Sequence, residues 1–351
     1  MKIYQIKLTP SSSFQSFPSS DTLFGAICWG IRRIYHESSD KNSLVDILRE
    51  FQLNPKFVIS SAFPYIEEEN NALPFYPRPI LESISASNIN KMEQTKKKIV
   101  DIISSYKKFK KAEYVSASLF IKILNSTSEG ELFKTFYNGG IKLTGKLLMD
   151  NEEYKTIFEK LKPESKSIAV QKNSIDRLTM STSGEGQTFY QQENFTNPAF
   201  KLHFLMKTNE IDFFRPVFRY LEDKGIGSNR TVGKGRFRIK ILNRVSLGDN
   251  KFPKFITLSR YIPDVFELNT DSKSMYYEIF PYRSKIDSEA EFKGEDVWKS
   301  RVMYLKEGSC FEAKEIKEYY GKLPVVKEIK GQKIYQNGLA FPVFGNFGGS
   351  R

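Results

Sequence analysis

The sequence predicts an α+β protein, and three patterns along its 351 residues lead to this fold class. A strand, a helix and a second strand candidate follow one another from Ile3 to Phe63. The strand-then-helix order returns between Phe200 and Asp223, and several strand-like runs follow Phe237. Alternation of this kind excludes an all-α or an all-β chain. We therefore expect two related units, with a C-terminal half rich in strands.

The N-terminal unit opens with a strand over residues 3–8, where apolar and polar side chains alternate. A helix is expected to begin at Ser19 or Ser20, because either side chain can cap it. Asp21 then lies in the first turn, where a negative charge suits the helix dipole. The apolar residues that follow recur at helical spacing and comprise Leu23, Phe24, Ile27, Ile31 and Ile34.

Two glycines, Gly25 and Gly30, weaken this helix by about 1 kcal/mol each relative to alanine. A helix tolerates that loss where it must lie close to a sheet. A second amphipathic helix is expected over 43–53 and a strand over 57–63. Residues 88–113 carry many lysines, with isoleucines between them at near-helical spacing. This pattern predicts a helix whose charged face is either solvated or bound to nucleic acid.

A long β-hairpin is expected over 173–195, with its turn at Ser183–Gly186 and its arms at Arg177–Met180 and Gln187–Tyr190. Its arms are too polar to be fully buried, so we expect the hairpin to project from the body. A strand over 200–206 and a helix over about 212–223 follow. Further strand candidates lie at 237–242, 255–258, 276–280, 301–305 and 339–344.

The composition restricts the class of protein. A net charge of +13 indicates either a polyanionic partner or a lysine-rich soluble surface. No run of 18 uncharged apolar residues is present, and the first residues lack a signal peptide pattern, so we expect a cytoplasmic protein without a membrane partner. Cys28, Cys310, His36 and His203 are too few for a disulfide framework or a zinc cage. We expect neither a metal nor a cofactor.

The most informative stretch is the glycine-rich loop, residues 225–238, which combines glycines, cations and short polar side chains. Glycines let the backbone approach a ligand and turn amide groups toward it, and the cations and hydroxyls suit a sugar-phosphate backbone. The candidate RNA-binding residues in this loop are Gly225, Gly227, Ser228, Asn229, Arg230, Thr231, Gly233, Lys234, Gly235 and Arg236.

Element order separates this loop from nucleotide-binding loops. A dinucleotide or P-loop runs from a strand into a helix, whereas this loop leaves a predicted helix and enters a predicted strand. Neither glycine motif is satisfied, because Arg230 stands where the third glycine of the dinucleotide motif would be. A helix C-cap at Gly225 followed by an ordinary loop is the structural alternative. It explains one glycine but not four glycines with three cations.

The loop, placed between a helix and a strand, resembles the glycine-rich loop of the RAMP superfamily of CRISPR proteins. The run Pro18–Ala26 resembles the start of the first helix in one branch, the fourth subunit of the type III-A Csm complex. Leu73–Pro79, Tyr114–Ser116 with the Leu119-Phe120 pair after it, and the Asp176-Arg177 pair add further similarity in the expected order. The resemblance therefore spans nearly the whole chain.

This resemblance implies two ferredoxin-like, RRM-like domains with a projecting hairpin thumb. The expected division is 1–165 for an N-terminal domain with a helical insertion, 166–199 for the thumb and 200–347 for a C-terminal domain. It implies a non-catalytic role in antiviral defence, in which the chain holds the 5′ handle of the guide RNA. The implied partners are the guide RNA, the large polymerase-like subunit and a backbone RAMP subunit. Carried over, the implied RNA contacts outside the loop are Ser16, Pro18, Ser19, Ser20, Asp176 and Arg177.

Two alternatives stay open. Some RAMP relatives cut precursor guide RNA without metal, and His36, just past the first helix, could serve as the general acid or base. A helix-end histidine can equally bind the last carbonyls of its helix. Alternatively, the 29 phenylalanines and 18 tyrosines would suit a scaffold with broad protein interfaces as well as they suit base stacking.

Overall fold

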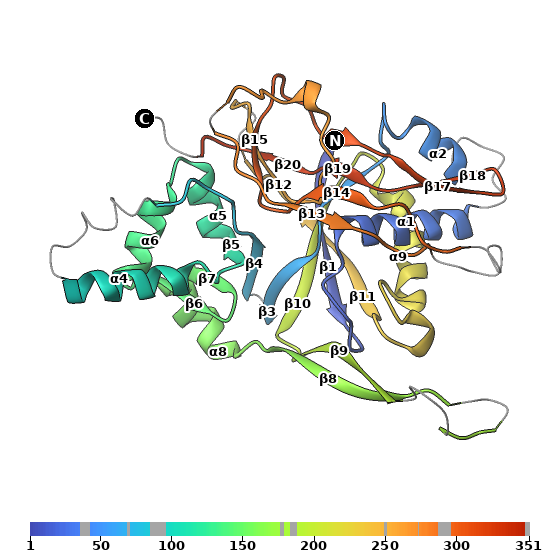
Figure 1. Ribbon diagram of the computed structural model, residues 1–351, viewed down its shortest axis with the longest axis horizontal. Coiled ribbons are helices and arrows are strands. Elements are labelled where there is room, and N and C mark those ends of the chain that lie inside the picture. The colour runs from blue at the N-terminus through green and yellow to red at the C-terminus, as the bar shows by residue number, and fades with distance from the viewer. Residues whose placement is uncertain are drawn as a thin grey trace.

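A nine-stranded sheet runs through the middle of the molecule (Figure 1). The computed structural model describes residues 1–35, 43–68, 71–84, 96–175, 179–182, 188–248, 251–272, 274–286 and 296–347. The strand order is β11-β1-β10-β3-β4-β5-β7-β6, and β2 pairs with β10. The strands of this sheet are β1 (Lys2–Pro10), β2 (Val58–Ile59), β3 (Phe63–Glu68), β4 (Asn71–Pro77), β5 (Tyr114–Ser116), β6 (Ile141–Thr144), β7 (Leu147–Asp150), β10 (Phe200–Thr208) and β11 (Phe237–Arg244).

Four of these strands and two helices form a ferredoxin-like unit. In chain order it runs β1, α1 (Ser20–Ile34), β3, β10, α9 (Ile211–Lys224) and β11. β1 lies between β10 and β11 and pairs antiparallel with both, and β10 pairs antiparallel with β3. This β-α-β-β-α-β order with the first strand in the centre is the ferredoxin-like topology. The predicted α+β fold class is confirmed.

Both strand–helix repeats expected from the sequence are present, and the sheet contains both of them. The division into 1–165, 166–199 and 200–347 stays a prediction, and the pairing of β1 with β10 and β11 joins its first and third parts. Alternate residues of β1 and β10, such as Ile6 and Phe204, are buried toward α1 and α9. The amphipathic pattern of both helices therefore sets which face of the sheet they cover.

Gly30 brings α1 against α9 rather than against a sheet. A Cβ atom built on Gly30 would lie 2.6 Å from Cγ1 of Val217 on α9, whereas one built on Gly25 meets nothing within 4 Å. The expectation of a close approach is thus correct for one of the two glycines, with a helix as the neighbour. Helix α1 starts after Ser19, as expected, but the Ser19 side chain makes no capping hydrogen bond; α2 (Leu44–Glu50) begins after Ser43.

A helical lobe covers the far end of the sheet, from β4 to β6 (Figure 1). It contains the lysine-rich helix predicted within 88–113, which the structure describes from Lys96 to Phe109. Ile102 and Phe109 are buried in the lobe, while Lys107 and Lys108 are exposed. The helices are α4 (Lys96–Phe109), α5 (Ala117–Leu124), α6 (Glu129–Tyr137), α7 (Asn151–Glu153), the π-helix η1 (Tyr154–Phe158) and α8 (Glu159–Leu161).

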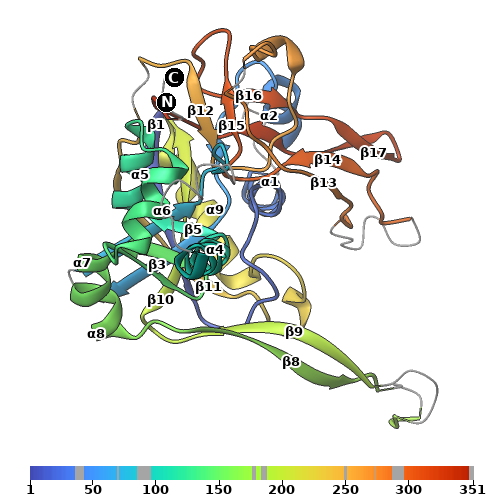
Figure 2. The ribbon, with the colours of Figure 1, turned by 60° about the vertical axis from the view of Figure 1, so that its left-hand side comes forward.

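The hairpin projects from the body, as expected, but its first arm was predicted wrongly (Figures 1 and 2). β8 (Ser165–Asn173) pairs with β9 (Thr188–Thr196), and the predicted arm at 177–180 is not a strand at its described residues, Thr179 and Met180. The expected tight turn would bring that segment opposite β9. Instead, the register pairs Asn173 with Thr188, so the connection is longer. Asp176, Arg177 and the expected turn at 183–186 lie outside the described residues.

The C-terminal part is rich in strands, as expected, and lies above the sheet in Figure 1. Its small sheets have the orders β15-β12-β20, β13-β14, β16-β19 and β17-β18. The predicted strand over 57–63 divides into β2 and the start of β3, because Ser61 donates its amide hydrogen to Leu258 of this part. The elements are β12 (Lys254–Thr257), the 3-10 helix η3 (Val265–Glu267), β13 (Ile279–Tyr282), β14 (Val302–Leu305), β15 (Cys310–Glu312), β16 (Tyr320–Lys322), β17 (Val325–Ile329), β18 (Gln332–Tyr335), β19 (Gly338–Ala340) and β20 (Pro342–Phe344).

Candidate nucleic-acid interface

A groove of about 1310 Å³ runs along α1 and has the glycine-rich loop as one of its walls. We call it the α1 groove. The β8–β9 hairpin and the strands β13, β14 and β17 extend to the same side of the molecule (Figure 2). Gln191 of β9 and residues 282–286, at the end of β13 and just after it, both line the groove. Among the described residues, one acidic residue, Asp21, lines it together with seven basic residues, which are Arg32, Arg49, Arg230, Arg283, Lys285, Lys299 and Lys333. A concave surface with this charge favours a polyanion.

The glycine-rich loop closes on itself at its two ends. The amide of Ile226 donates to the carbonyl of Gly235 at 2.8 Å. A Cβ atom on Gly235 would lie 2.2 Å from the oxygen of Ile226, and one on Gly225 would lie 3.0 Å from the oxygen of Gly235. Both residues also have positive φ, which glycine adopts without strain. Two of the four glycines therefore serve the closure of the loop. Gly227 and Gly233 have open space where a ligand could approach.

The loop is held against the end of β1. The amide of Gly235 donates to the carbonyl of Ser13 at 2.9 Å, and the amide of Arg236 donates to the hydroxyl of Ser12 at 3.0 Å. The amide of Ser11 donates in turn to the carbonyl of Arg236 at 2.8 Å. The serine-rich stretch that follows β1 therefore fixes the position of the loop. Its composition alone could not indicate this partner, which lies more than 200 residues away.

Lys234 is bound inside the protein. Its ammonium lies 2.8 Å from Oε2 of Glu193 on β9 and 2.9 Å from the hydroxyl of Ser13. Lys172 of β8 contacts the other oxygen of Glu193 at 2.5 Å. Burial acts to raise the pKa of Glu193, but hydrogen bonds from Lys172, Lys234 and Ser13 outweigh it and lower the pKa to about 2. The Glu193 carboxylate therefore stays ionised and joins both hairpin strands to the loop.

The predicted RNA contacts differ in their exposure. Those with exposed side chains are Ser16, Ser228, Thr231 and Arg236. Those that are partly buried are Gly227, Asn229, Arg230, Gly233 and Lys234. Those that are buried are Pro18, Ser19, Ser20, Gly225 and Gly235. The side chains of Pro18, Ser19 and Ser20 lie inside the protein, and RNA contact at these three residues stays a prediction.

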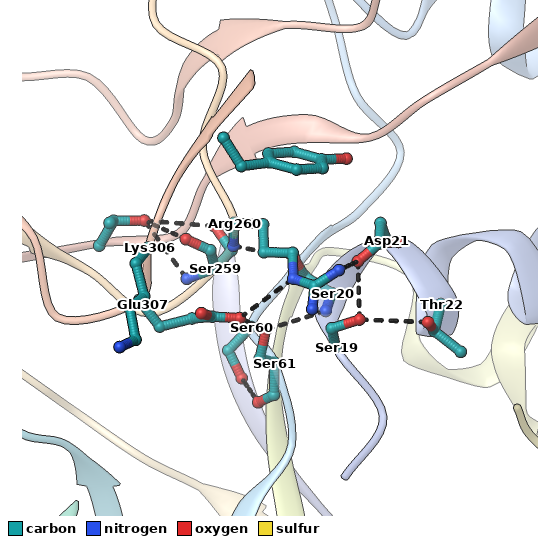
Figure 3. A network of polar contacts seen from close by, with 12 residues as sticks. Ser19, Ser20, Asp21, Thr22, Ser60, Ser61, Ser259, Arg260, Lys306 and Glu307 are labelled. Atoms are coloured by element: carbon teal, nitrogen blue, oxygen red, sulfur yellow. Dashed lines mark hydrogen bonds and ion pairs between the residues drawn. The ribbon is translucent and has the colours of Figure 1, made fainter. Parts of the chain in front are cut away.

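Ser19 and Ser20 belong to a buried polar network at the start of α1 (Figure 3). The Ser20 hydroxyl accepts a hydrogen bond from the amide of Arg260 at 3.0 Å, and Ser19 donates to Asp21 at 2.7 Å. The Arg260 guanidinium lies 2.9 Å from Oδ1 of Asp21 and 4.4 Å from the ring centroid of Tyr282. This network connects the first helix to the C-terminal strands, so the local sequence around Ser19 serves packing between distant segments.

The two histidines offer no general acid or base among the described residues. His36 lies outside them. His203 is fully buried on β10. Its Nε2 lies 2.8 Å from the backbone carbonyl of Phe75, and its Nδ1 lies 3.1 Å from Nε2 of the Gln5 side chain. Since the carbonyl only accepts, Nε2 carries the proton and Nδ1 accepts from Gln5. Burial lowers the pKa of His203 to about 4, although the bond to Phe75 opposes the shift. This imidazole is a neutral core residue.

Sequence reasoning missed several residues that line the groove. Trp29 and Trp298 are the two tryptophans of the chain, and both line it, as do Arg283 and Lys285. The available signal was the proximity of basic residues to each tryptophan, with Arg32 and Arg33 after Trp29 and Lys299 after Trp298. Within the described parts of the chain, no three His, Cys, Asp or Glu side chains come together as metal ligands. No helix in those parts is long and apolar enough to cross a membrane.

Comparison with solved structures places this architecture among known folds. A crystal structure of a Csm3-Csm4 subcomplex in the type III-A CRISPR-Cas interference complex contains a chain that matches with a TM-score of 0.60 and 16% identity. The match covers 98% of this chain and 99% of that one. A Csm1-Csm4 cassette in complex with pppApA matches with a TM-score of 0.55 and 17% identity over 99% of both chains. This chain has the fold of a Csm subunit.

A further crystal structure, a Csm1-Csm4 cassette in complex with AMPPNP, matches with a TM-score of 0.53 and 18% identity over 100% of both chains. Csm4 is the component that these three assemblies share, and the full coverage shows that no large part of this chain lies outside the shared fold. No protein-family model matches the chain. Its sequence matches no curated protein either.

Proposed function

We propose that this protein is a non-catalytic RNA-binding subunit of a type III-A CRISPR interference complex and holds the 5′ handle of the guide RNA. The α1 groove carries this proposal, because the part of its lining that the structure describes has seven basic residues against one acidic residue. Asp21, the acidic one, is already paired with Arg260. The groove therefore offers a surplus of positive charge to phosphates.

A second basic surface lies along β11, the edge strand of the sheet, on the face away from α1. Arg236, Arg238 and Lys240 alternate along the chain with buried or partly buried residues and are all exposed. Side chains at alternate positions lie on one face of a strand, so these three cations lie in a row. Charged edge strands also prevent sheets from pairing edge to edge, which is the structural alternative for this row. This row is separate from the groove and would give an RNA backbone a second basic surface.

The bridging part of the proposal rests on the likeness to assemblies in which Csm4 is crystallised with Csm1 or with Csm3. We propose that this chain contacts a large polymerase-like subunit and a backbone RAMP subunit through separate surfaces. Co-expression with each candidate partner, followed by affinity purification and size-exclusion chromatography, tests this part. Stable complexes with both partners in one particle support it, and failure with either partner contradicts it.

The RNA part is tested by incubating the purified protein, without metal, with labelled precursor guide RNA and with mature 5′-handle RNA. We expect tight binding of the handle without cleavage. Arg230→Ala and Arg283→Ala should each weaken binding and reduce the slope of log affinity against log salt by about 1. Lys314→Ala removes an exposed lysine outside the groove and serves as the matched control. Equal binding and equal salt slopes in all four proteins would remove the groove from the interface.

The same assay decides the alternative activity. Metal-independent cutting of the precursor that disappears in His36→Ala would show that the chain is an endoribonuclease with His36 as general acid or base. Binding without cutting in both proteins supports the non-catalytic role.

A further inference from the structure

Trp298 differs from Trp29 in the way it lines the α1 groove. Trp29 lies on α1 and packs against the small cluster formed by Ile286 and Ile329, so its indole has a structural partner. Trp298 belongs to no buried cluster among the described residues, and its side chain is 42% exposed. An indole combines a flat apolar surface with a polar N–H group, so an exposed tryptophan in a groove can serve as a contact surface for a ligand.

The backbone around Trp298 is ordered as a short antiparallel pair. The amide of Ile286 donates to the carbonyl of Val297 at 2.7 Å, and the amide of Lys299 donates to the carbonyl of Ser284 at 3.0 Å. This pairing places Lys285 opposite Trp298. Because Arg283 lies two residues before Lys285, the two cations and the indole share one face of the pair.

Both cations rest on the indole. The Lys285 ammonium lies 4.6 Å from the ring centroid and the Arg283 guanidinium lies 5.2 Å from it. Arg283 also donates to the carbonyl of Lys299 at 3.0 Å, which limits its movement. Among the described residues next to this pair, Asp296 is acidic; it accepts a hydrogen bond from the Trp298 amide and pairs with Lys327 at 2.7 Å, so its charge is compensated. The face is therefore aromatic, cationic and held in place before any ligand binds.

Resting on the proposed function, we propose that Trp298 is a stacking platform for one unpaired nucleobase of the bound RNA, with Arg283 and Lys285 binding the phosphates beside it. The ligand class is single-stranded RNA. A base inside a duplex is already stacked on its neighbours, whereas an unpaired base can turn its flat face onto an indole. The glycine-rich loop and Trp298 line the same groove, so one strand would contact the loop with its backbone and Trp298 with a base.

The fluorescence of Trp298 can be observed alone, since the chain has two tryptophans. In a Trp29→Phe background, titration with an unlabelled single-stranded 12-nucleotide RNA should quench the remaining emission. An RNA duplex of the same length should quench it much less. Affinity is then measured by anisotropy with a labelled single strand. Trp298→Ala should weaken binding about tenfold, and Trp298→Phe should retain most of the affinity because the ring still stacks.

Phe266→Ala is the matched control, because Phe266 is 79% exposed and does not line the groove. Its affinity should equal that of the wild-type protein, and circular dichroism checks that every variant is folded. If wild-type protein binds no RNA, the proposed function itself fails. If it binds RNA with the groove-dependent salt slope but Trp298→Ala binds equally well and no quenching occurs, only the platform is overturned. Trp298→Ala that loses a protein partner while keeping RNA affinity would also overturn it.

Discussion

The ammonium of Lys234 lies 2.8 Å from Oε2 of Glu193, which joins the glycine-rich loop to the base of the projecting hairpin. Because Lys172 of the opposite hairpin strand contacts the same carboxylate, the loop and both strands share one buried anion. Lys234 was expected to contact RNA, but its charge is compensated inside the protein. The position of the loop and the direction of the hairpin are thus coupled through Glu193.

Glu193→Gln should therefore lower the free energy of unfolding by about 2 kcal/mol at pH 7, because charge-assisted hydrogen bonds are lost. The Glu193 pKa is lowered from 4.5 to about 2 in the folded protein. Its stabilisation is thus fully present above pH 4.5 and is lost as the pH falls toward 2. Urea unfolding at pH 7 and at pH 3 measures the free energy of unfolding of the variant and of the wild type. The two free energies should differ less at pH 3 than at pH 7. Glu164→Gln is the control, because its pair with Lys166 is exposed and should contribute little.

The outer half of the hairpin should be dispensable for folding. Ile175, Phe189 and Tyr190 are exposed on it, and β8 pairs only with β9 among the described residues. Replacing residues 173–188 with Asn-Gly keeps Lys172 and its pairing with Phe189 and supplies a two-residue turn. We expect a melting temperature within a few degrees of the wild type and weaker binding of handle RNA. A variant that unfolds globally would show that the hairpin supports the core.

Alanine at the two glycines of α1 should have opposite effects. Gly25 has open space around it, so Gly25→Ala should stabilise the protein by up to about 1 kcal/mol through helix propensity. Gly30→Ala places a Cβ atom 2.6 Å from the Val217 side chain and should destabilise by about 2 kcal/mol through overpacking. Thermal unfolding of the two variants compares them directly. If both substitutions changed the melting temperature by the same amount and in the same direction, α1 and α9 would not approach each other as described.

Stability should rise with pH around neutrality because of Lys207. Burial lowers the pKa of this side chain to about 7, although the Glu318 carboxylate opposes the shift. Between pH 7 and 10.5 the unfolded chain holds a proton there that the folded protein does not, so stability increases as protons are removed. We expect a gain of about 2 kcal/mol between pH 7 and pH 9. Lys207→Met should abolish this gain in urea unfolding, while Lys314→Met, at an exposed site, should keep it.

Much of the local structure followed from short stretches of sequence. The start of α1 after Ser19, the apolar spacing of α1 and the order of helix, glycine-rich loop and strand are all encoded within about fifteen residues each. Periodicity and capping act between neighbours in the chain, so a single sequence carries their signal. The α+β class, the projecting hairpin and the basic character of the chain were predictable for the same reason.

The site depended on contacts between residues far apart in the chain. Ser19 and Ser20 were predicted to bind RNA, and the structure packs Ser20 against Arg260; Lys234, also predicted to bind RNA, pairs with Glu193. The tertiary fold likewise brought Trp298 to the groove that starts at α1. Long-range pairing leaves no periodic pattern in either partner. The sequence therefore predicts which elements form, while packing decides which side chains are left to meet RNA.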